Sequence, residues 1–252
     1  QSVCYVDGDV SEWTREDVAA ESDGLTLSVK YDEKYVYFMI HKDGLDFEED
    51  CIFIPIDTTP KTGSSYCRNY DVMFDRAADF LLVLNGKDNS RLLVQERYEA
   101  LRSTYAEEVY SFNTYAQDYI PDADSPEFVN INLLLSMGLP VEDKYMAREA
   151  TTFETGKLTY GNANPEAEDF NSLADFICKG DYIEIKLPWQ LLNFADPSRM
   201  EILDDYYDGN YGVDYIKIDK MYVGVGDTSR EGSMHLSEVK LKGWKDKVTY
   251  HE

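Results

Sequence analysis

The chain has 252 residues, 43% of them hydrophobic, and its 49 acidic residues against 24 basic ones give a formal net charge of −25. This apolar content suffices for a sizeable core, while so negative a surface repels the phosphates of nucleic acids and anionic membranes, so we expect contact with neither. The sequence contains no long apolar run or signal peptide, and its abrupt start at Gln1 indicates part of a longer protein, tethered to other domains. No linker-like stretch divides it, so we expect one domain over residues 1–252.

The stretch Leu25–Asp57 carries the clearest pattern. Apolar and polar residues alternate over Leu25–Lys30, which predicts a strand with one wet face, and Tyr35–His41 is apolar on both faces, as in a central strand covered on both sides. Cys51–Ile56 gives a third strand, where Pro55 predicts a bulge or a lost neighbour because proline cannot donate to a β-ladder. We expect these three strands to form the middle of one antiparallel sheet under a second layer.

The rest of the chain repeats the β pattern around a less regular middle. Val3–Trp13 predicts a short leading strand that turns over at Asp7-Gly8-Asp9. Further strands are expected at Phe80–Leu84, Leu92–Gln95, Asp181–Leu187, Ile216–Ile218, Met221–Val225 and His235–Lys242.

Residues 96–180 are expected to form a long insertion lying across the sandwich. Apolar residues recur there at helical spacing from Tyr98 to Val109, which predicts a short amphipathic helix. Turn-forming clusters and short apolar runs follow. The whole sequence therefore predicts an all-β fold, an antiparallel β-sandwich of immunoglobulin or jelly-roll type with a long, partly helical insertion.

The cysteines and the clustered acids give weak signals. The four cysteines, too few and too scattered for a disulfide scaffold, are Cys4, Cys51, Cys67 and Cys178. Whether any two are oxidised stays open, and the absence of Asn-x-Ser/Thr sequons favours a bacterial source. Asp7, Asp9 and Glu12 offer oxygen ligands of the kind that calcium prefers, but they lack the spacing of an EF-hand loop, so a solvated turn is the favoured interpretation.

Six pieces of sequence occur in an order typical of one known family. They are VDGDVSEW, VKYDEKYVYFMIHKDG, FEEDCIFIPID, Lys61-Thr62-Gly63, Ala78-Asp79-Phe80 with Asn85-Gly86, and YIEIKLPWQLL. In this order the chain resembles a family 9 carbohydrate-binding module, within the wider DOMON-like group of β-sandwiches. The resemblance implies a non-catalytic module that binds an oligo- or polysaccharide, outside the cell or at its surface, within a larger bacterial protein. It also implies a structural calcium ion, whose ligands match no particular residues here, and no other cofactor.

The resemblance also indicates where a sugar would bind. The family holds the sugar between two aromatic rings, because the C–H face of a pyranose packs well on a ring. The position of the first ring is Phe47, ahead of Glu48 and Asp50. The loop Thr228–Ser233, where the second ring is expected, has no aromatic residue and offers Arg230 instead. The tyrosines that could replace the missing ring are Tyr66, Tyr70, Tyr115 and Tyr160.

Three other functional classes stay open. A glycoside hydrolase needs two carboxylates at a defined separation, but the acids at 48–50 and at 204–205 are interpreted as solvated turns, and no HExxH, GxSxG or P-loop signature occurs, so no catalytic residue is assigned. Some DOMON-like proteins hold haem between Met and His, but Met39 and His41 share one face of a strand and cannot ligate opposite sides of an iron. A structural or protein-interaction module that keeps the fold without a sugar site is the main alternative.

Overall fold

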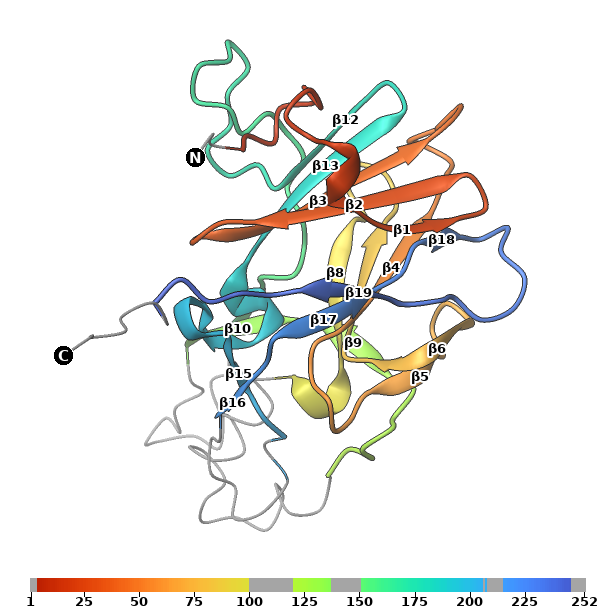
Figure 1. Ribbon diagram of the computed structural model, residues 1–252, viewed down its shortest axis with the longest axis vertical. Coiled ribbons are helices and arrows are strands. Elements are labelled where there is room, and N and C mark those ends of the chain that lie inside the picture. The colour runs from red at the N-terminus through yellow and green to blue at the C-terminus, as the bar shows by residue number, and fades with distance from the viewer. Residues whose placement is uncertain (1–3, 100–119, 137–150, 206, 208–214, 246–252) are drawn as a thin grey trace, which may run out of the picture.

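The computed structural model describes residues 4–99, 120–136, 151–205, 207 and 215–245. Two antiparallel sheets lie one on the other (Figure 1). The first sheet contains, in spatial order, β1 (Val18–Ser22), β2 (Leu25–Tyr31), β3 (Tyr35–Lys42), β13 (Tyr182–Pro188) and β12 (Phe176–Lys179). The second contains β19 (Ser237–Lys240), β17 (Lys220–Val223), β4 (Ile52–Asp57), β7 (Phe80–Leu84), β8 (Arg91–Gln95) and β9 (Phe128–Asn130), and β18 (Gly226–Asp227) also pairs with β4.

Smaller elements surround the two sheets. The short strands are β5 (Ser64–Cys67) with β6 (Val72–Ala78), β10 (Asn132–Ser136) with β11 (Thr151–Glu154), and β14 (Phe194–Asp196) with β15 (Glu201–Leu203) and β16 (Tyr215–Lys217). The helical elements among the described residues are short 3₁₀ turns, η1 (Arg15–Asp17), η2 (Glu96–Tyr98), η4 (Trp189–Leu192) and η5 (Pro197–Arg199). The predicted all-β sandwich is therefore confirmed, while its finer resemblance to one family stays a prediction.

The main core fills the space between the two sheets. Inward-facing side chains such as Leu27 and Phe38 of the first sheet and Ile54 and Leu82 of the second are fully buried. Trp189 is buried beside them on η4, where it donates a hydrogen bond from Nε1 to the carbonyl of Asp32, 2.9 Å away. The period-two pattern of these strands arises because alternate side chains must enter this layer.

Both outer faces of the sandwich are partly covered as well. The hairpin of β5 and β6 covers the second sheet through a smaller apolar cluster that includes Phe53, Phe74 and Met234. An N-terminal arm, Cys4–Trp13, covers the first sheet, where Val6 and Trp13 of the arm pack with Tyr37 and Met39. The two-sided burial of Tyr35–His41 that the sequence predicts is thus confirmed.

The structure corrects one expectation about the sheets and confirms another. β2 and β3 lie in the first sheet, but β4 lies in the second, so the three strands do not form the middle of one sheet. The loop between β3 and β4 is long enough to cross between the layers, and strand periodicity does not specify the pairing partner. Pro55 in β4 pairs with Leu81 on one side and faces the break between β17 and β18 on the other, which is the predicted loss of a neighbouring strand.

Two further expectations are wrong. The described residues of Val3–Trp13 form turns instead of a strand, although the turn at Asp7-Gly8-Asp9 is present, with φ of Gly8 at +86°. The partly helical insertion at 96–180 is not seen, because its described residues form short strands, irregular connections and the single turn η2. Most of the expected helix from Tyr98 to Val109 lies outside the described residues.

Candidate functional site

The expected sugar-binding ring, Phe47, lies in the loop between β3 and β4. It is half-buried, and its ring centre lies 5.5 Å from that of Tyr160 and 6.2 Å from that of Phe176. Tyr160, one of the tyrosines considered as a second ring, therefore packs directly on Phe47 and leaves no gap for a sugar between the two rings. Tyr115 lies outside the described residues.

The polar residues expected beside Phe47 are engaged in loop contacts. Glu48 is exposed, and the carboxylate of Asp50 lies 3.0 Å from Nζ of Lys42, which also lies 3.4 Å from the carboxylate of Asp227 in β18. The side chain of Arg230 is only 13% exposed and donates hydrogen bonds to Oγ of Ser22 and to a backbone carbonyl. These contacts connect the loops at one end of the sandwich.

The remaining expected residues, Tyr66 and Tyr70, lie on the outer hairpin of β5 and β6. The hydroxyl of Tyr66 donates to Asp71 over 2.8 Å, and the ring of Tyr70 packs on Phe53 with 5.2 Å between the ring centres. Among the described residues, neither ring packs on Phe47. Among the described residues, the predicted residues therefore lie partly in the loops around Phe47 and partly on the outer hairpin, and their role in binding stays a prediction.

A pocket of about 190 Å³ lies elsewhere, where the β4 and β17 strands meet the connection from β16. It is lined by Asp57, Thr58, Thr59, Pro60, Arg76, Lys217, Ile218, Asp219, Lys220 and Tyr222. The lining combines an aromatic ring, hydroxyl and carboxyl groups and three cationic side chains. This is the mixture of one apolar surface with a few placed polar groups that small-ligand sites require.

Arg76 of β6 is the best-positioned charged group of this pocket. Its Nε lies 3.1 Å from the carboxylate of Asp57 in β4, and its guanidinium carbon lies 3.5 Å above the centre of the Tyr222 ring in β17. Two neighbouring strands thus fix the guanidinium, β4 by an ion pair and β17 by a cation–π contact.

A second acid lies behind Asp57. Asp79 is fully buried, and its carboxylate accepts hydrogen bonds from the backbone N–H groups of Thr58 and Thr59 over 2.8 and 2.9 Å and from the Thr59 hydroxyl over 2.9 Å. Burial raises the pKa of Asp57 although Arg76 opposes the shift, and burial together with the charge of Asp57 raises the pKa of Asp79. Asp79 therefore fixes the Thr58-Thr59 wall of the pocket.

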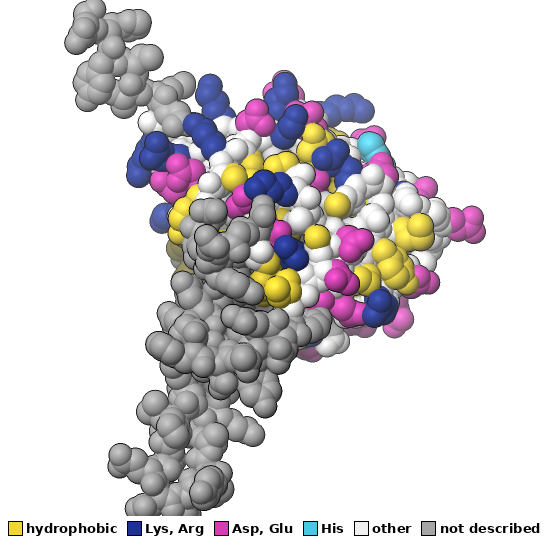
Figure 2. All heavy atoms as spheres, turned by 90° about the horizontal axis from the view of Figure 1, so that it is seen from below, with side chains coloured by type: hydrophobic (Ala, Val, Ile, Leu, Met, Phe, Trp, Pro, Cys, Tyr) yellow, Lys and Arg dark blue, Asp and Glu magenta, His cyan; other side chains and the backbone are white. Residues whose placement is uncertain are grey.

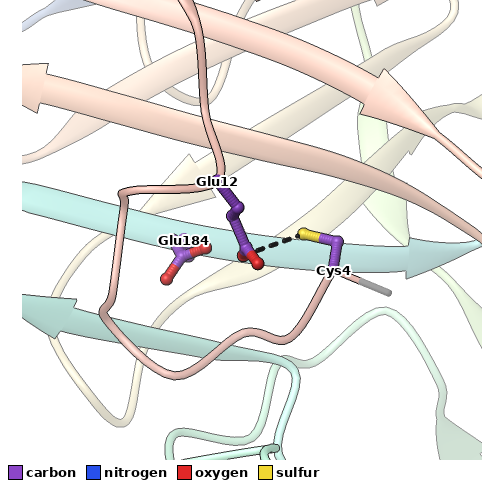
Figure 3. Close-up of side chains that lie close together, drawn as sticks. All are labelled: Cys4, Glu12 and Glu184. Carbon is purple, nitrogen blue, oxygen red and sulfur yellow. Dashed lines mark hydrogen bonds between the residues drawn. The ribbon is translucent and has the colours of Figure 1, made fainter. Parts of the chain in front are cut away.

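A second cluster of titratable groups lies under the N-terminal arm. The thiol of Cys4 and the carboxylate of Glu12, both on the arm, point toward Glu184 of β13 (Figure 3). The thiol donates to Glu12 over 3.2 Å, and Glu184 accepts from the backbone N–H of Gly8 over 2.8 Å and from Nε1 of Trp13 over 3.0 Å. This arrangement attaches the arm to the sheet.

Burial shifts the pKa values of the groups under the arm upward. Burial raises the pKa of the Cys4 thiol and of Glu12, and it raises the pKa of Glu184 to about 7 against the donors that Gly8 and Trp13 supply. Asp7 and Asp9, the other acids considered for calcium, accept hydrogen bonds from backbone N–H groups of the turn.

The side-chain clusters of the described residues include no all-oxygen group for the implied calcium ion, which stays a prediction. Among the described residues, two groups of three side chains could hold a metal, the Cys4 group and His41 with Asp43 and Asp181. One contains a thiol and the other an imidazole, whereas calcium takes six to eight oxygen ligands. His41 lies 3.3 Å from Asp43, and Met39, two residues before it, is buried under the arm.

The comparisons with known proteins do not assign the chain to a family. No family model matches the chain, and neither a curated protein nor a solved structure matches it. Within the residues that the structure describes, no helix is long and apolar enough to cross a membrane. The resemblance to carbohydrate-binding modules therefore stays a prediction.

The pocket residues were not singled out from the sequence. Asp57 directly follows the predicted strand Cys51–Ile56, Tyr222 is the second residue of the predicted strand Met221–Val225, and Arg76 belongs to no motif. A signal was present in the basic residues Lys217 and Lys220, which lie close together in a strongly acidic chain. Whether these two lysines contribute to a site depends on which strands become neighbours, and the local sequence pattern does not specify this.

Proposed function

We propose that this chain is a non-catalytic carbohydrate-binding module of a larger secreted or cell-surface bacterial protein, and that the pocket at Arg76 and Tyr222 holds the sugar. One observation carries the proposal: a pocket of about 190 Å³, roughly the size of one sugar ring, opens on a β-sandwich and is lined by hydroxyl, carboxyl and cationic groups beside an aromatic ring. The β-sandwich is also the fold that the family resemblance implies.

Binding without catalysis is favoured by the engagement of the acids near the pocket. Glycoside hydrolysis needs one carboxyl group free to protonate the leaving group and another free to act as base or nucleophile. Asp57 is paired with Arg76, and the oxygens of Asp79 accept hydrogen bonds from Thr58 and Thr59. Incubation with a panel of aryl-glycosides should release no product, and release that depends on Asp57 would contradict this part of the proposal.

Calorimetric titration tests the function itself. The whole chain is titrated with soluble oligosaccharides of the β-glucan, xylan, mannan and galacturonan types, with and without added calcium. We expect saturable binding of at least one class, weakened by Arg76→Gln. The matched control is Arg68→Gln, which removes another arginine of the outer hairpin, one paired with Glu127 and absent from the pocket lining.

The same titration locates the site. Phe47→Ala should lower stability, since the ring packs on Tyr160 and Phe176, and leave sugar affinity unchanged if the pocket is the site. Loss of binding in folded Phe47→Ala, with Arg76→Gln unaffected, would instead place the site at the loop predicted from the family. No heat with any sugar would favour the alternative, a protein-interaction module that keeps the sandwich alone.

A further inference from the structure

The guanidinium of Arg76 is fixed in position, but not all of its N–H donors have an acceptor among the described residues. Asp57 occupies its Nε side and the Tyr222 ring lies against one face of its plane. Within the described part of the chain, no acceptor is recorded for its terminal nitrogens Nη1 and Nη2, and the side chain is 41% exposed. A planar fork of N–H donors fixed in this way is preorganised to bind a second oxyanion at little entropic cost.

A second cation lies on the same pocket. Lys220, the first residue of β17, is exposed, and no carboxylate of the described residues lies within 4.0 Å of its Nζ. With Lys217 the lining holds three cationic side chains against two acids, Asp57 and Asp219. The whole chain has 49 acidic and 24 basic residues, so the pocket lining is richer in cations than the chain as a whole.

Basic side chains are unevenly distributed on the surface as well. Seen from below in Figure 2, Lys and Arg side chains are most frequent over the upper part of the view, with Asp and Glu side chains among them, and Asp and Glu predominate toward the right. A local cationic site can therefore exist on a protein whose total charge is −25. The total charge still repels a long polyanion, because repulsion grows with each further anionic group that approaches.

We propose that the pocket binds a single acidic sugar residue, whose carboxylate or sulfate group is held by Arg76 and Lys220 while the sugar ring occupies the rest of the pocket. This inference rests on the proposed function and specifies its ligand. The anionic group accepts two N–H bonds from the free edge of the guanidinium and faces the ammonium of Lys220. The volume admits one ring, so selectivity falls on one acidic residue and not on an extended acidic chain.

The simpler interpretation is that Arg76 only neutralises Asp57. A counter-ion for a buried carboxylate needs no unused donors and no second cation beside it, whereas both are present here. The two interpretations differ in a measurable way. If Arg76 serves only Asp57, an acidic sugar and its uncharged ester will bind equally well.

The test is a calorimetric titration of the whole chain with matched ligands. The ligands are an oligosaccharide carrying one galacturonate or glucuronate, its methyl ester, the neutral parent sugar, a monosulfated analogue, and inorganic sulfate alone. We expect the acid to bind about tenfold or more tightly than its ester, as for a charge-assisted hydrogen-bonded pair. Comparing the uronate with the sulfated analogue shows which of the two anionic groups is preferred.

Variants assign the effect to residues. Lys220→Gln, at an exposed position, should reduce the acid-to-ester ratio several-fold without affecting folding, and Arg76→Lys should reduce it because an ammonium lacks the fork. Arg68→Gln serves as control and should leave the ratio unchanged. Thermal unfolding of each variant separates lost binding from lost structure, and Lys220→Gln keeps the test decisive if the Arg76 variants do not fold.

Each outcome has one meaning. Equal binding of acid, ester and neutral sugar would overturn this inference and leave the proposed function intact. No binding of any sugar would overturn both. Inorganic sulfate bound as tightly as the acidic sugar would mean a general anion site and would overturn the assignment to a sugar.

Discussion

The pocket at Arg76 and the cluster under the N-terminal arm each bury a carboxylate, but they compensate its charge differently. Asp57 is paired with a guanidinium that a ring holds in place. Glu184 is 1% exposed and receives only neutral N–H donors, with Glu12 and Asp7 nearby. The guanidinium thus opposes the rise in the pKa of Asp57 that burial causes, whereas the neutral N–H donors of Glu184 leave its pKa at about 7.

The largest expected effect concerns Glu184 and pH. Its pKa is about 7 in the folded chain against an ordinary value of 4.5. The stability that this group contributes is complete below pH 4.5 and is lost as the pH rises to 7, by roughly 3 kcal/mol at most. Glu184→Gln should remove this loss, so its free energy of unfolding should fall less between pH 5 and pH 8 than that of the unmodified chain.

Urea unfolding at a series of pH values measures this difference. Glu238→Gln, at an exposed position of β19, is the matched control and should keep the original pH dependence. Identical pH profiles for Glu184→Gln and the unmodified chain would show that Glu184 stays charged under the arm. The comparison with Asp57 would then fail, because neutral donors alone would suffice for a buried carboxylate.

The next effect in size concerns the pocket. Arg76→Gln leaves the carboxylate of Asp57, 7% exposed, without its cation. Removing one partner of a buried pair costs about 3 kcal/mol or more, and because Arg76 is 41% exposed we expect roughly 2 kcal/mol. The double variant Arg76→Gln/Asp57→Asn should regain part of this stability in urea unfolding, since it removes the unpaired charge too.

The double variant also separates stability from binding. It should bind an acidic sugar no more tightly than the uncharged ester, even where its stability is restored. A double variant no more stable than Arg76→Gln would show that the guanidinium stabilises the fold through its contact with Tyr222 and not through Asp57.

The local sequence pattern predicts which residues form strands better than it predicts which strands pair with each other. The apolar run Tyr35–His41 predicts burial on both faces, and Pro55 predicts the break that β17 and β18 leave beside β4. The placement of β4 in the second sheet was missed because period two specifies a strand and its faces, but not its partner.

The candidate site was missed for the same reason. Asp57, Arg76 and Tyr222 meet because β4, β6 and β17 become neighbours, and no spacing within the sequence encodes their meeting. Phe47, by contrast, is visible as an aromatic residue before an acidic run, but its ring is used for packing on Tyr160. Residue type indicates which chemistry is present, and tertiary contacts decide whether a side chain is free to use it.

The smallest effect expected concerns Trp13, which links the arm to Glu184. Trp13→Phe removes the donor from Nε1 to the Glu184 carboxylate and weakens the contact with Lys30, whose Nζ lies 4.2 Å from the ring centre. A lost hydrogen bond to a charged group costs about 1.5 to 3 kcal/mol, and because Glu184 is only about half ionised near neutral pH we expect the lower end. Because this bond favours the carboxylate, the pKa of Glu184 should rise further. A carboxyl-carbon NMR titration measures that pKa directly. Trp244→Phe, at a ring that packs on Trp189, is the control and should lower stability without moving it. If Trp13→Phe left the pKa unchanged, the donors of the arm would not control the charge of Glu184, and burial alone would explain why this acid differs from Asp57.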